Sequence, residues 1–335
     1  MPPNSKSLSS DQNGRTAAPQ ISKYSSLEFQ QSVLDLIRRT FSSAYSDPHA
    51  LAEAIQAVKA HLFARNYSAA FESPAYLLAY FVRWSPSRTL AYLHVFADLC
   101  PQIRNYLSTS TKQSKNVLCI GGGAGGEVLA MAALADAVGA SNLNIAAVDI
   151  AHWDDVFARL RDGIKRILKW EGGNQDASHD KIQLLFNQFD ILDAPCYVED
   201  STGNEQREEQ INEVFKTDGS VNFKSIGLIT ILFTTNELFA QSKPRAMTLI
   251  KHIAETSQTG TLVLVLESAG SYSHIQIGSK TFPVQFLLDH TFVDGGYGWE
   301  KLVDEESVWF RLDERLKYPL QLENMRFFIR LYRKL

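Results

Sequence analysis

The chain has 335 residues, of which 45% are hydrophobic and 21% charged, and its formal net charge is −4. This is enough apolar material for one large domain or two modest ones. The slight acidity gives no overall attraction to nucleic acid, so any surface that binds nucleic acid must be a local basic patch. Three cysteines, Cys100, Cys119 and Cys196, show neither a CxxC pair nor metal-ligand spacing, which indicates the reduced thiols of an intracellular protein.

Residues 1–23 are rich in Ser, Pro, Asn and Gln, and they contain no apolar core of the kind that makes a secretory signal. We expect this segment to be a disordered tail. No apolar run approaches membrane-spanning length. The sequence therefore predicts a soluble protein inside the cell, and its dispersed basic stretches leave nucleus, nucleolus and cytoplasm open.

Residues 24–112 show helical patterns without strands and predict an N-terminal helical module. The segment LEFQQSVLDLIRRTF carries one apolar stripe. Asp47-Pro48 then begins ALAEAIQAVKAHLF, with the proline where a first helical turn tolerates it. Two further helices are expected around YLLAYFVRW and RTLAYLHVFADL, with Ser85-Pro86-Ser87 separating them.

From residue 113 to residue 335, strand-like and helical runs alternate. The strand-like runs are NVLCI (116–120), LNIAAVDI (143–150), KIQLLFNQFDI (181–191), IGLITILFT (226–234), TLVLVLES (261–268), and VWFRL and RFFIRLYRK in the tail. Near-continuous apolar strands between helices indicate a parallel sheet covered on both faces. We therefore predict an α/β fold with a mostly parallel, Rossmann-like sheet. The polar segment EDSTGNEQREEQ (199–210) is expected to be a solvated loop.

The first strand runs directly into a glycine-rich loop and then a helix. Five of the six residues 121–126 are glycine, so the backbone can approach a ligand closely, and the helix start adds unpaired N–H groups. A dehydrogenase would place a pyrophosphate there, and a methyltransferase the amino-acid end of S-adenosylmethionine; a tight turn without ligand is the structural alternative. The candidate cofactor-binding residues are Gly121, Gly122, Gly123, Gly125 and Glu127, the last being equally explained as a carboxylate favoured by the helix dipole.

Two acids at successive strand ends favour a nucleoside along the sheet edge. Asp149 ends the second strand, where a carboxylate can accept hydrogen bonds from ribose hydroxyls. Asp190 ends the third strand and suits the exocyclic amine of adenine, with Phe189 or Ile150 against the ring face. A capping or turn carboxylate is the alternative for Asp190. This pair is more typical of a methyltransferase than of a dehydrogenase.

The fourth strand ends in FTTNELF, where side chains should face the ligand crevice. Asn236 and Glu237 are therefore candidate catalytic residues that orient or deprotonate an acceptor nitrogen, although Glu237 is equally consistent with a helix cap. After the fifth strand, Tyr272 lies in a small loop on the same edge and offers a stacking face. The eight histidines form no HExxH motif and no metal triad, so we assign no metal.

Together, GGGAGGE, VDIA followed by WDDV, FTTNELF, SAGSYS and RWSPSR resemble the fungal 25S ribosomal RNA (uridine-N(3)) methyltransferase family over about residues 25–335. This resemblance implies a class I fold, S-adenosylmethionine as cofactor, and ribosomal RNA or a pre-ribosomal particle as partner. It also implies N(3) of one uridine as the methylated atom. By motif position it assigns Gly121, Gly123, Gly125, Asp149 and Asp190 to the cofactor, and it assigns no catalytic base.

Methylation at N(3) requires removal of the proton that this atom carries at neutral pH. Glu237 is our candidate to accept it, directly or through water, while Asn236 holds a uracil carbonyl and Tyr272 stacks on a turned-out uridine. For RNA affinity, Arg83 and Arg88 flank Trp84 in RWSPSR. RDGIKRILK and the tail RFFIRLYRK add further positive charge, and each cluster is also explained as a solvated face.

Three other functions stay open from the residues alone. A methyltransferase acting on a small metabolite would share the cofactor residues but needs a closed apolar pocket, which the N-terminal helices could roof. An aminopropyltransferase has a similar loop, but it needs an acid pair where this chain has threonines and Asn236. A ribosome-assembly factor could keep the fold without turnover.

Overall fold

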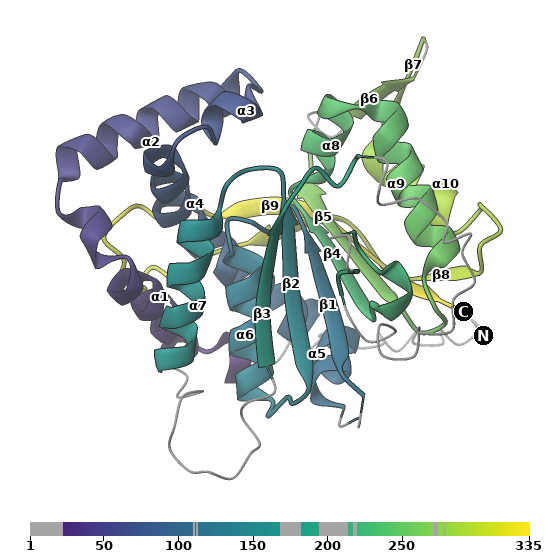
Figure 1. Ribbon diagram of the computed structural model, residues 1–335, viewed down its shortest axis with the longest axis horizontal. Coiled ribbons are helices and arrows are strands. Elements are labelled where there is room, and N and C mark those ends of the chain that lie inside the picture. The colour runs from purple at the N-terminus through teal and green to yellow at the C-terminus, as the bar shows by residue number, and fades with distance from the viewer. Residues whose placement is uncertain are drawn as a thin grey trace, which may run out of the picture.

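A computed structural model describes residues 23–109, 111, 113–167, 182–193, 214–216, 220–270, 274–277 and 279–335. At its centre lies a seven-stranded sheet in the order β3-β2-β1-β4-β5-β9-β8 (Figure 1). Of the expected tail, residues 1–22 lie outside the described ranges, and so does the expected loop 199–210.

The first five strands and β9 agree with the sequence pattern to within a few residues, whereas β8 begins nine residues before the expected run VWFRL (308–312). The strands are β1 Lys115–Ile120, β2 Leu143–Asp149, β3 Ile182–Gln188, β4 Leu228–Leu232, β5 Leu262–Ser268, β8 Trp299–Phe310 and β9 Met325–Lys334, with a separate hairpin of β6 His274–Ile277 and β7 Lys280–Pro283. The first five pair in parallel, whereas β9 is antiparallel to both β5 and β8. This confirms the mostly parallel sheet, and it collects the carboxyl ends of the parallel strands at one edge.

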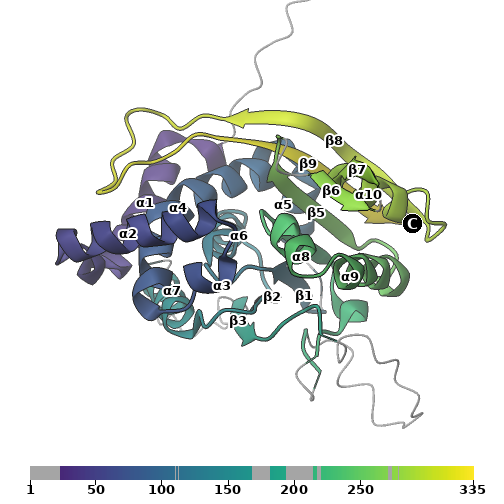
Figure 2. The same ribbon diagram turned by 90° about the horizontal axis from the view of Figure 1, so that it is seen from above.

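Helices cover both faces of the sheet. They are α1 Leu27–Thr40, α2 Pro48–Phe63, α3 Tyr67–Ala70, α4 Pro74–His94, α5 Pro101–Ser108, α6 Gly126–Ala137, α7 Asp154–Ile167, α8 Thr235–Gln241, α9 Lys243–Thr256 and α10 Val284–Phe292. Seen from above, α1–α4, α6 and α7 lie on one side of the parallel strands, and α8, α9 and α10 on the other (Figure 2). Two hydrophobic clusters, one on each face, follow from this arrangement.

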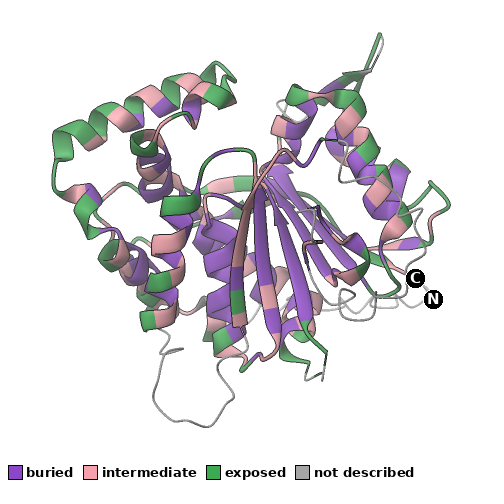
Figure 3. Ribbon diagram, in the orientation of Figure 1, coloured by how far each residue is buried: buried purple, intermediate pink, exposed green. Residues whose placement is uncertain are grey.

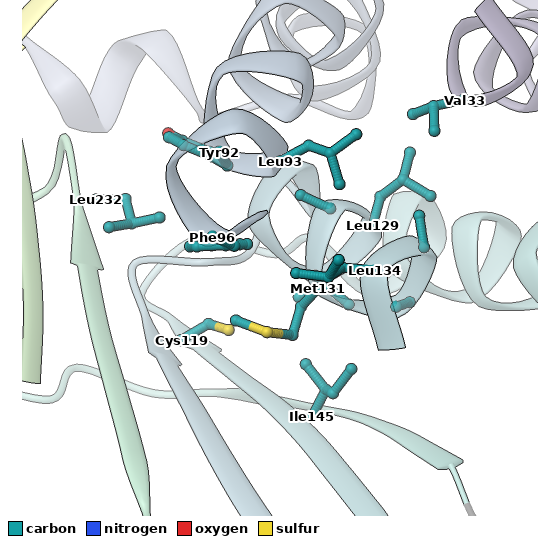
Figure 4. Packing of buried hydrophobic residues seen from close by; sticks show 14 of the residues in the cluster. Val33, Tyr92, Leu93, Phe96, Cys119, Leu129, Met131, Leu134, Ile145 and Leu232 are labelled. Atoms are coloured by element: carbon teal, nitrogen blue, oxygen red, sulfur yellow. The ribbon is translucent and has the colours of Figure 1, made fainter. Parts of the chain in front are cut away.

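The alternation of side chains along each strand supplies both clusters. On β1, Cys119 packs toward α6, while Leu118 and Ile120 pack toward α9 and α10. Figure 4 shows Met131 of α6 lying over Cys119. Helix α6 is buried almost throughout because the sheet covers one side of it and α4 the other (Figure 3). This double cover explains why its sequence is apolar and rich in alanine without a polar face.

The expected break at Ser85-Pro86-Ser87 is wrong, because α4 runs through it as one 21-residue helix. A proline inside a helix leaves the carbonyl four residues earlier without its donor. Here that carbonyl, on Val82, accepts a hydrogen bond from the Tyr318 hydroxyl at 3.0 Å. The backbone N–H of Glu323 also donates to Ser87 Oγ at 2.9 Å. The segment between β8 and β9 thus replaces the bond that the proline removes.

Candidate active site

A cavity of about 580 Å³ lies at the carboxyl edge of the parallel strands, where open α/β sheets bind ligands. We call the part built on strand ends the sheet wall: Gly121, Gly122, Ala124–Glu127, Asp149–Trp153, Leu232–Thr234, Glu237, Ala240 and Gln241. The facing part, from the N-terminal helices, is the helix wall: Arg65–Ser68, Phe71, Glu72, Tyr80, Ser85, Arg88 and Tyr92.

The glycine loop is shaped by the protein's own packing as well as by the cavity. Gly121 and Gly125 adopt φ of 73° and 70°, the left-handed region that favours glycine. A Cβ on Gly121 would lie 2.3 Å from the Thr234 side chain, and one on Gly123 would lie 2.0 Å from the Trp153 ring. Gly123 itself does not line the cavity. Side chains at these positions are therefore excluded by protein contacts, a reason for glycine that sequence reasoning did not foresee.

Helix α4 holds the glycine loop from the opposite side. Ser85 Oγ donates a hydrogen bond to the Ala124 carbonyl at 3.2 Å, and Thr89 Oγ1 donates to the Gly126 carbonyl at 3.1 Å. The residues of the RWSPSR motif and its neighbour thus fix the loop. This function was missed from the sequence, because nothing in the spacing links residues 85–89 to residues 124–126.

Glu127 lies beneath the loop in the first turn of α6. It is buried, and neither carboxyl oxygen has a hydrogen-bond partner among the described residues. Burial raises the pKa of Glu127 well above its usual range. Because α6 begins after Gly125 without a side-chain cap, the N–H groups of its first turn are also available at the cavity. A zwitterionic amino-acid group would satisfy both features, which fits the amino-acid end of S-adenosylmethionine.

Asp149 ends β2 and lines the cavity, as the sequence predicts. Its carboxylate accepts hydrogen bonds from the backbone N–H groups of Gly123 at 3.1 Å and Ala151 at 3.0 Å. Burial raises the pKa of Asp149 to about 6, against the lowering effect of these bonds. The two oxygens keep capacity for further donors such as ribose hydroxyls. Beside it, Ile150 also lines the cavity, and 53% of its surface is exposed.

Asp190 and Phe189 lie near the cavity but are not among its lining residues. Asp190 Oδ1 accepts from the Leu192 N–H at 2.9 Å, and Oδ2 accepts from the side-chain amide of Gln241, which does line the cavity. Asp190 therefore has the geometry of a turn carboxylate, which was the alternative interpretation from the sequence. It is separated from the cavity by the side chain of Gln241. Its contact with adenine stays a prediction.

Glu237 projects into the cavity from the first turn of α8. It makes no hydrogen bond or ion pair within the described ranges. Burial, reinforced by the negative charge of Asp149, raises the pKa of Glu237 to about 8, and the Arg88 guanidinium opposes this shift. A partly protonated carboxyl group with this pKa is suited to accept a proton near neutral pH.

Asn236 faces a different space from Glu237. It borders a second, smaller cavity together with Leu62, Phe63, Arg65 and Tyr67. Its backbone N–H donates to Glu267 Oε2 at 3.1 Å. Glu267, which is buried at the end of β5, thus caps α8 and positions the turn that carries Glu237. Sequence reasoning missed Glu267, although a single acid at the end of an apolar strand was the available signal.

Phe233 joins the two walls. Its φ of 58° is a strained conformation for a residue with a side chain, and such strain is concentrated at functional sites. Its ring packs against Tyr92 of the helix wall, and the Arg88 guanidinium carbon lies 5.2 Å from the ring centroid. Arg88 also donates a hydrogen bond to the Tyr80 hydroxyl. Tyr80, Tyr92 and Phe233 therefore hold Arg88 at the cavity.

The two arginines of RWSPSR have different environments. Arg88 lines the cavity, whereas Arg83 donates to the Gln321 carbonyl at 2.9 Å and forms an ion pair with Glu323. Arg83 thus attaches α4 to the segment between β8 and β9. Tyr272, the third predicted substrate residue, lies outside the described residues.

The described ranges contain no group of three or more His, Cys, Asp or Glu side chains arranged to hold a metal ion. Among the helices in those ranges, none is both long enough and apolar enough to cross a membrane.

Comparison with known proteins identifies the family. The model of a family described as "Putative SAM-dependent methyltransferase" matches residues 37–333. The chain belongs to this family. It is also 37% identical to the 25S rRNA (uridine(2843)-N(3))-methyltransferase of Saccharomyces cerevisiae, over 91% of this chain and 85% of the yeast protein. Its cofactor is accordingly S-adenosylmethionine, and the predicted class I methyltransferase fold is confirmed.

Solved structures of methyltransferases overlap with the chain in part. A SAM-dependent methyltransferase from Methanosarcina mazei matches with 14% identity and a TM-score of 0.39, over 70% of this chain and 97% of that one. The N-methyltransferase NodS from Bradyrhizobium japonicum matches with 13% identity and a TM-score of 0.33, over 69% and 92%.

Proposed function

We propose that this enzyme transfers the methyl group of S-adenosylmethionine to N(3) of a uridine in large-subunit ribosomal RNA. The substrate is the RNA itself or a pre-ribosomal particle, which would place the enzyme in the nucleolus, nucleus or cytoplasm. The activity stated in the name of the yeast relative supports this acceptor. The observation that carries the proposal is that Glu237, with a pKa of about 8, shares one cavity with the glycine loop.

The sheet wall would hold the cofactor. The backbone of Gly121 and Gly122, the start of α6 and the Glu127 carboxyl group would receive the amino-acid end. Asp149 would accept hydrogen bonds from the ribose hydroxyls, and Ile150 would lie against the adenine ring. When bound, S-adenosylmethionine supplies an already activated methyl group, so the protein mainly has to align the acceptor atom.

The acceptor would be bound between the two walls. Glu237 would take the N(3) proton, after which the uracil ring carries negative charge shared with its two carbonyl oxygens. Arg88 faces the same cavity and would stabilise that charge, as electrostatic groups at a developing anion do. Tyr80 and Tyr92 would contact the ring face. In this proposal the helical module 24–112 binds the acceptor, and residues 113–335 bind the cofactor.

The test is methylation of defined RNA by the purified full chain. A large-subunit RNA fragment, S-adenosylmethionine carrying a labelled methyl group, and mass spectrometry of the digested nucleosides would reveal 3-methyluridine. We expect this product with the native fragment and none when the target uridine is replaced by cytidine. Saturable cofactor binding without methylation of free RNA or of pre-ribosomal particles would overturn the proposal and favour a silent assembly factor. Transfer to a small metabolite alone would favour the metabolite enzyme.

A further inference from the structure

The positive charges of the C-terminal strands are mostly neutralised within the protein. Arg330 on β9 is buried, with 1% of its surface exposed, and forms ion pairs with Asp289, Asp304 and Glu306. Arg333 pairs with Glu300. The expected basic surface of the tail is therefore wrong for Arg330, which belongs to an internal network.

Two arginines at the other end of the same strands differ from these. Arg311 and Arg326 are both exposed, and neither lies within 4 Å of a carboxylate in the described ranges. Their guanidinium carbons lie 5.6 Å and 5.8 Å from the ring centroid of Trp309. Both distances are near the outer limit of a cation–π contact, about 6 Å. The arginines therefore hold the indole only loosely.

The Trp309 side chain is unusually exposed for a large aromatic residue, with 57% of its surface accessible to solvent. Its neighbour on β8, Phe310, is buried and packs against the ring of His94 on α4. Strand alternation places Trp309 on the opposite face, away from that core. An exposed tryptophan flanked by two arginines that have no acidic partner among the described residues has no evident function in the stability of the fold.

The position of this group relates it to the active site. Trp309 pairs with Arg326 across β8 and β9, and the next residue of β9, Phe327, pairs with Ser268 at the carboxyl end of β5. Neighbouring strands lie about 4.8 Å apart, so Trp309 is roughly 10 Å from the end of β5. That end carries Glu267, which caps the helix of Glu237. Trp309 thus lies along the same sheet edge as the cavity.

We propose that Trp309, Arg311 and Arg326 form a docking platform for single-stranded RNA next to the methylated uridine. The indole would stack on a base, and the two guanidinium groups would contact backbone phosphates, which is how proteins bind single strands without reading sequence. The inference rests on the proposed RNA substrate. It explains how a chain of net charge −4 binds a polyanion, since two cations that no described carboxylate neutralises are concentrated at one place.

The experiment compares RNA binding, by fluorescence anisotropy, of the full chain and three variants. Trp309→Ala should weaken binding of a single-stranded fragment carrying the target uridine by about 5- to 150-fold, the range for losing one stacked base. Trp309→Phe should restore most of the affinity. Arg311→Gln combined with Arg326→Gln should reduce the slope of log affinity against log salt by about 1.4, for two phosphate contacts.

Matched controls separate the platform from general surface effects. Phe286→Ala removes an exposed aromatic ring from α10, and Arg315→Gln removes an exposed arginine that pairs with Asp313. Neither should change RNA affinity, and cofactor affinity should be unchanged in every variant.

The outcomes also separate this inference from the proposed function. If the native chain neither binds nor methylates RNA, the proposed function fails and the platform with it. If the native chain methylates RNA and Trp309→Ala binds that RNA equally well, only the platform is wrong. If the substitution weakens binding to a pre-ribosomal particle but not to naked RNA, the surface contacts a protein and the RNA platform is overturned.

Discussion

The two walls of the cavity are built by different means. The sheet wall consists of backbone turns and side chains that directly follow β1, β2 and β4, so its residues are fixed by short-range geometry. The helix wall consists of residues of α3, of α4 and of the segments that flank α3, and α4 reaches the cavity because it packs against α6 and the glycine loop. The first wall is local in sequence, and the second depends on tertiary packing.

This difference suggests a division of work. The sheet wall offers backbone N–H groups and carboxylates, which suit the cofactor shared by the whole family. The helix wall offers tyrosines and two arginines, Arg65 and Arg88, which suit a planar acceptor that becomes negatively charged. Glu237 belongs to the sheet wall but faces Arg88, so it lies where the two meet. Substitutions should therefore separate into three classes: those that affect chemistry, cofactor binding or acceptor binding.

The largest effect is expected at the junction of the walls. Glu237→Gln keeps the shape but removes the proton acceptor, so kcat should fall by about 10²- to 10⁴-fold while cofactor affinity is retained. Glu72→Gln is the matched control, because Glu72 also lines the cavity but is exposed. Single-turnover methylation of the RNA fragment measures the step directly. A kcat within a few-fold of the native value would exclude Glu237 as the base.

The pH profile sharpens the same prediction. With a pKa raised to about 8, Glu237 is mostly protonated at pH 7 and becomes the competent base as pH rises. For the native enzyme, log(kcat/KM) should thus rise with a slope of about 1 below pH 8 and level off above it. The residual rate of Glu237→Gln should lack this inflection. An unchanged inflection in the variant would assign it to another group.

The next effect belongs to the sheet wall. Asp149→Asn removes the charge that would accept the ribose hydroxyls, and cofactor affinity at pH 8 should fall about 10- to 100-fold, the value of one charged hydrogen bond. Because the pKa of Asp149 is raised to about 6, the native protein should itself lose affinity below pH 6, so the two proteins should converge at pH 5. Calorimetric titration measures both. Asp190→Asn should have a smaller effect, since its carboxylate already binds Leu192 and Gln241.

The sheet wall was also the part that the sequence could predict. The apolar runs predicted the parallel strands. Because the carboxyl ends of parallel strands lie at one edge of the sheet, Asp149 and Glu237 could be placed at the cavity from their positions in the sequence alone. The packing contacts that require glycine in this loop could not be predicted. Gly123 must lack a side chain because the Trp153 ring, 30 residues further along the chain, occupies that space, and no sequence pattern indicates this contact.

The helix wall was predicted poorly for the same physical reason. Whether α4 breaks at Pro86 is decided by Tyr318, more than 200 residues away, whose hydroxyl satisfies the Val82 carbonyl. That continuity sets which side of α4 faces the cavity. The motif RWSPSR therefore indicated the positive charge correctly. It did not indicate that Arg83 and Arg88 contact different partners.

This pair of arginines gives the last and smallest expected effect. Arg88→Gln should raise the KM for RNA and lower kcat/KM by about 10- to 30-fold, the lower part of the range for one charge-assisted hydrogen bond, without changing cofactor affinity. Arg83→Gln, more than one turn earlier on the same helix, loses the bonds to Gln321 and Glu323 and the contact with the Trp84 ring, and it should lower the melting temperature but not kcat/KM. Arg88→Lys should recover part of the rate, because charge matters more than shape near a developing anion. If Arg83→Gln impaired kcat/KM as much as Arg88→Gln did, the assignment of acceptor binding to the cavity face of α4 would be wrong, and the outer face of α4 would contact the RNA.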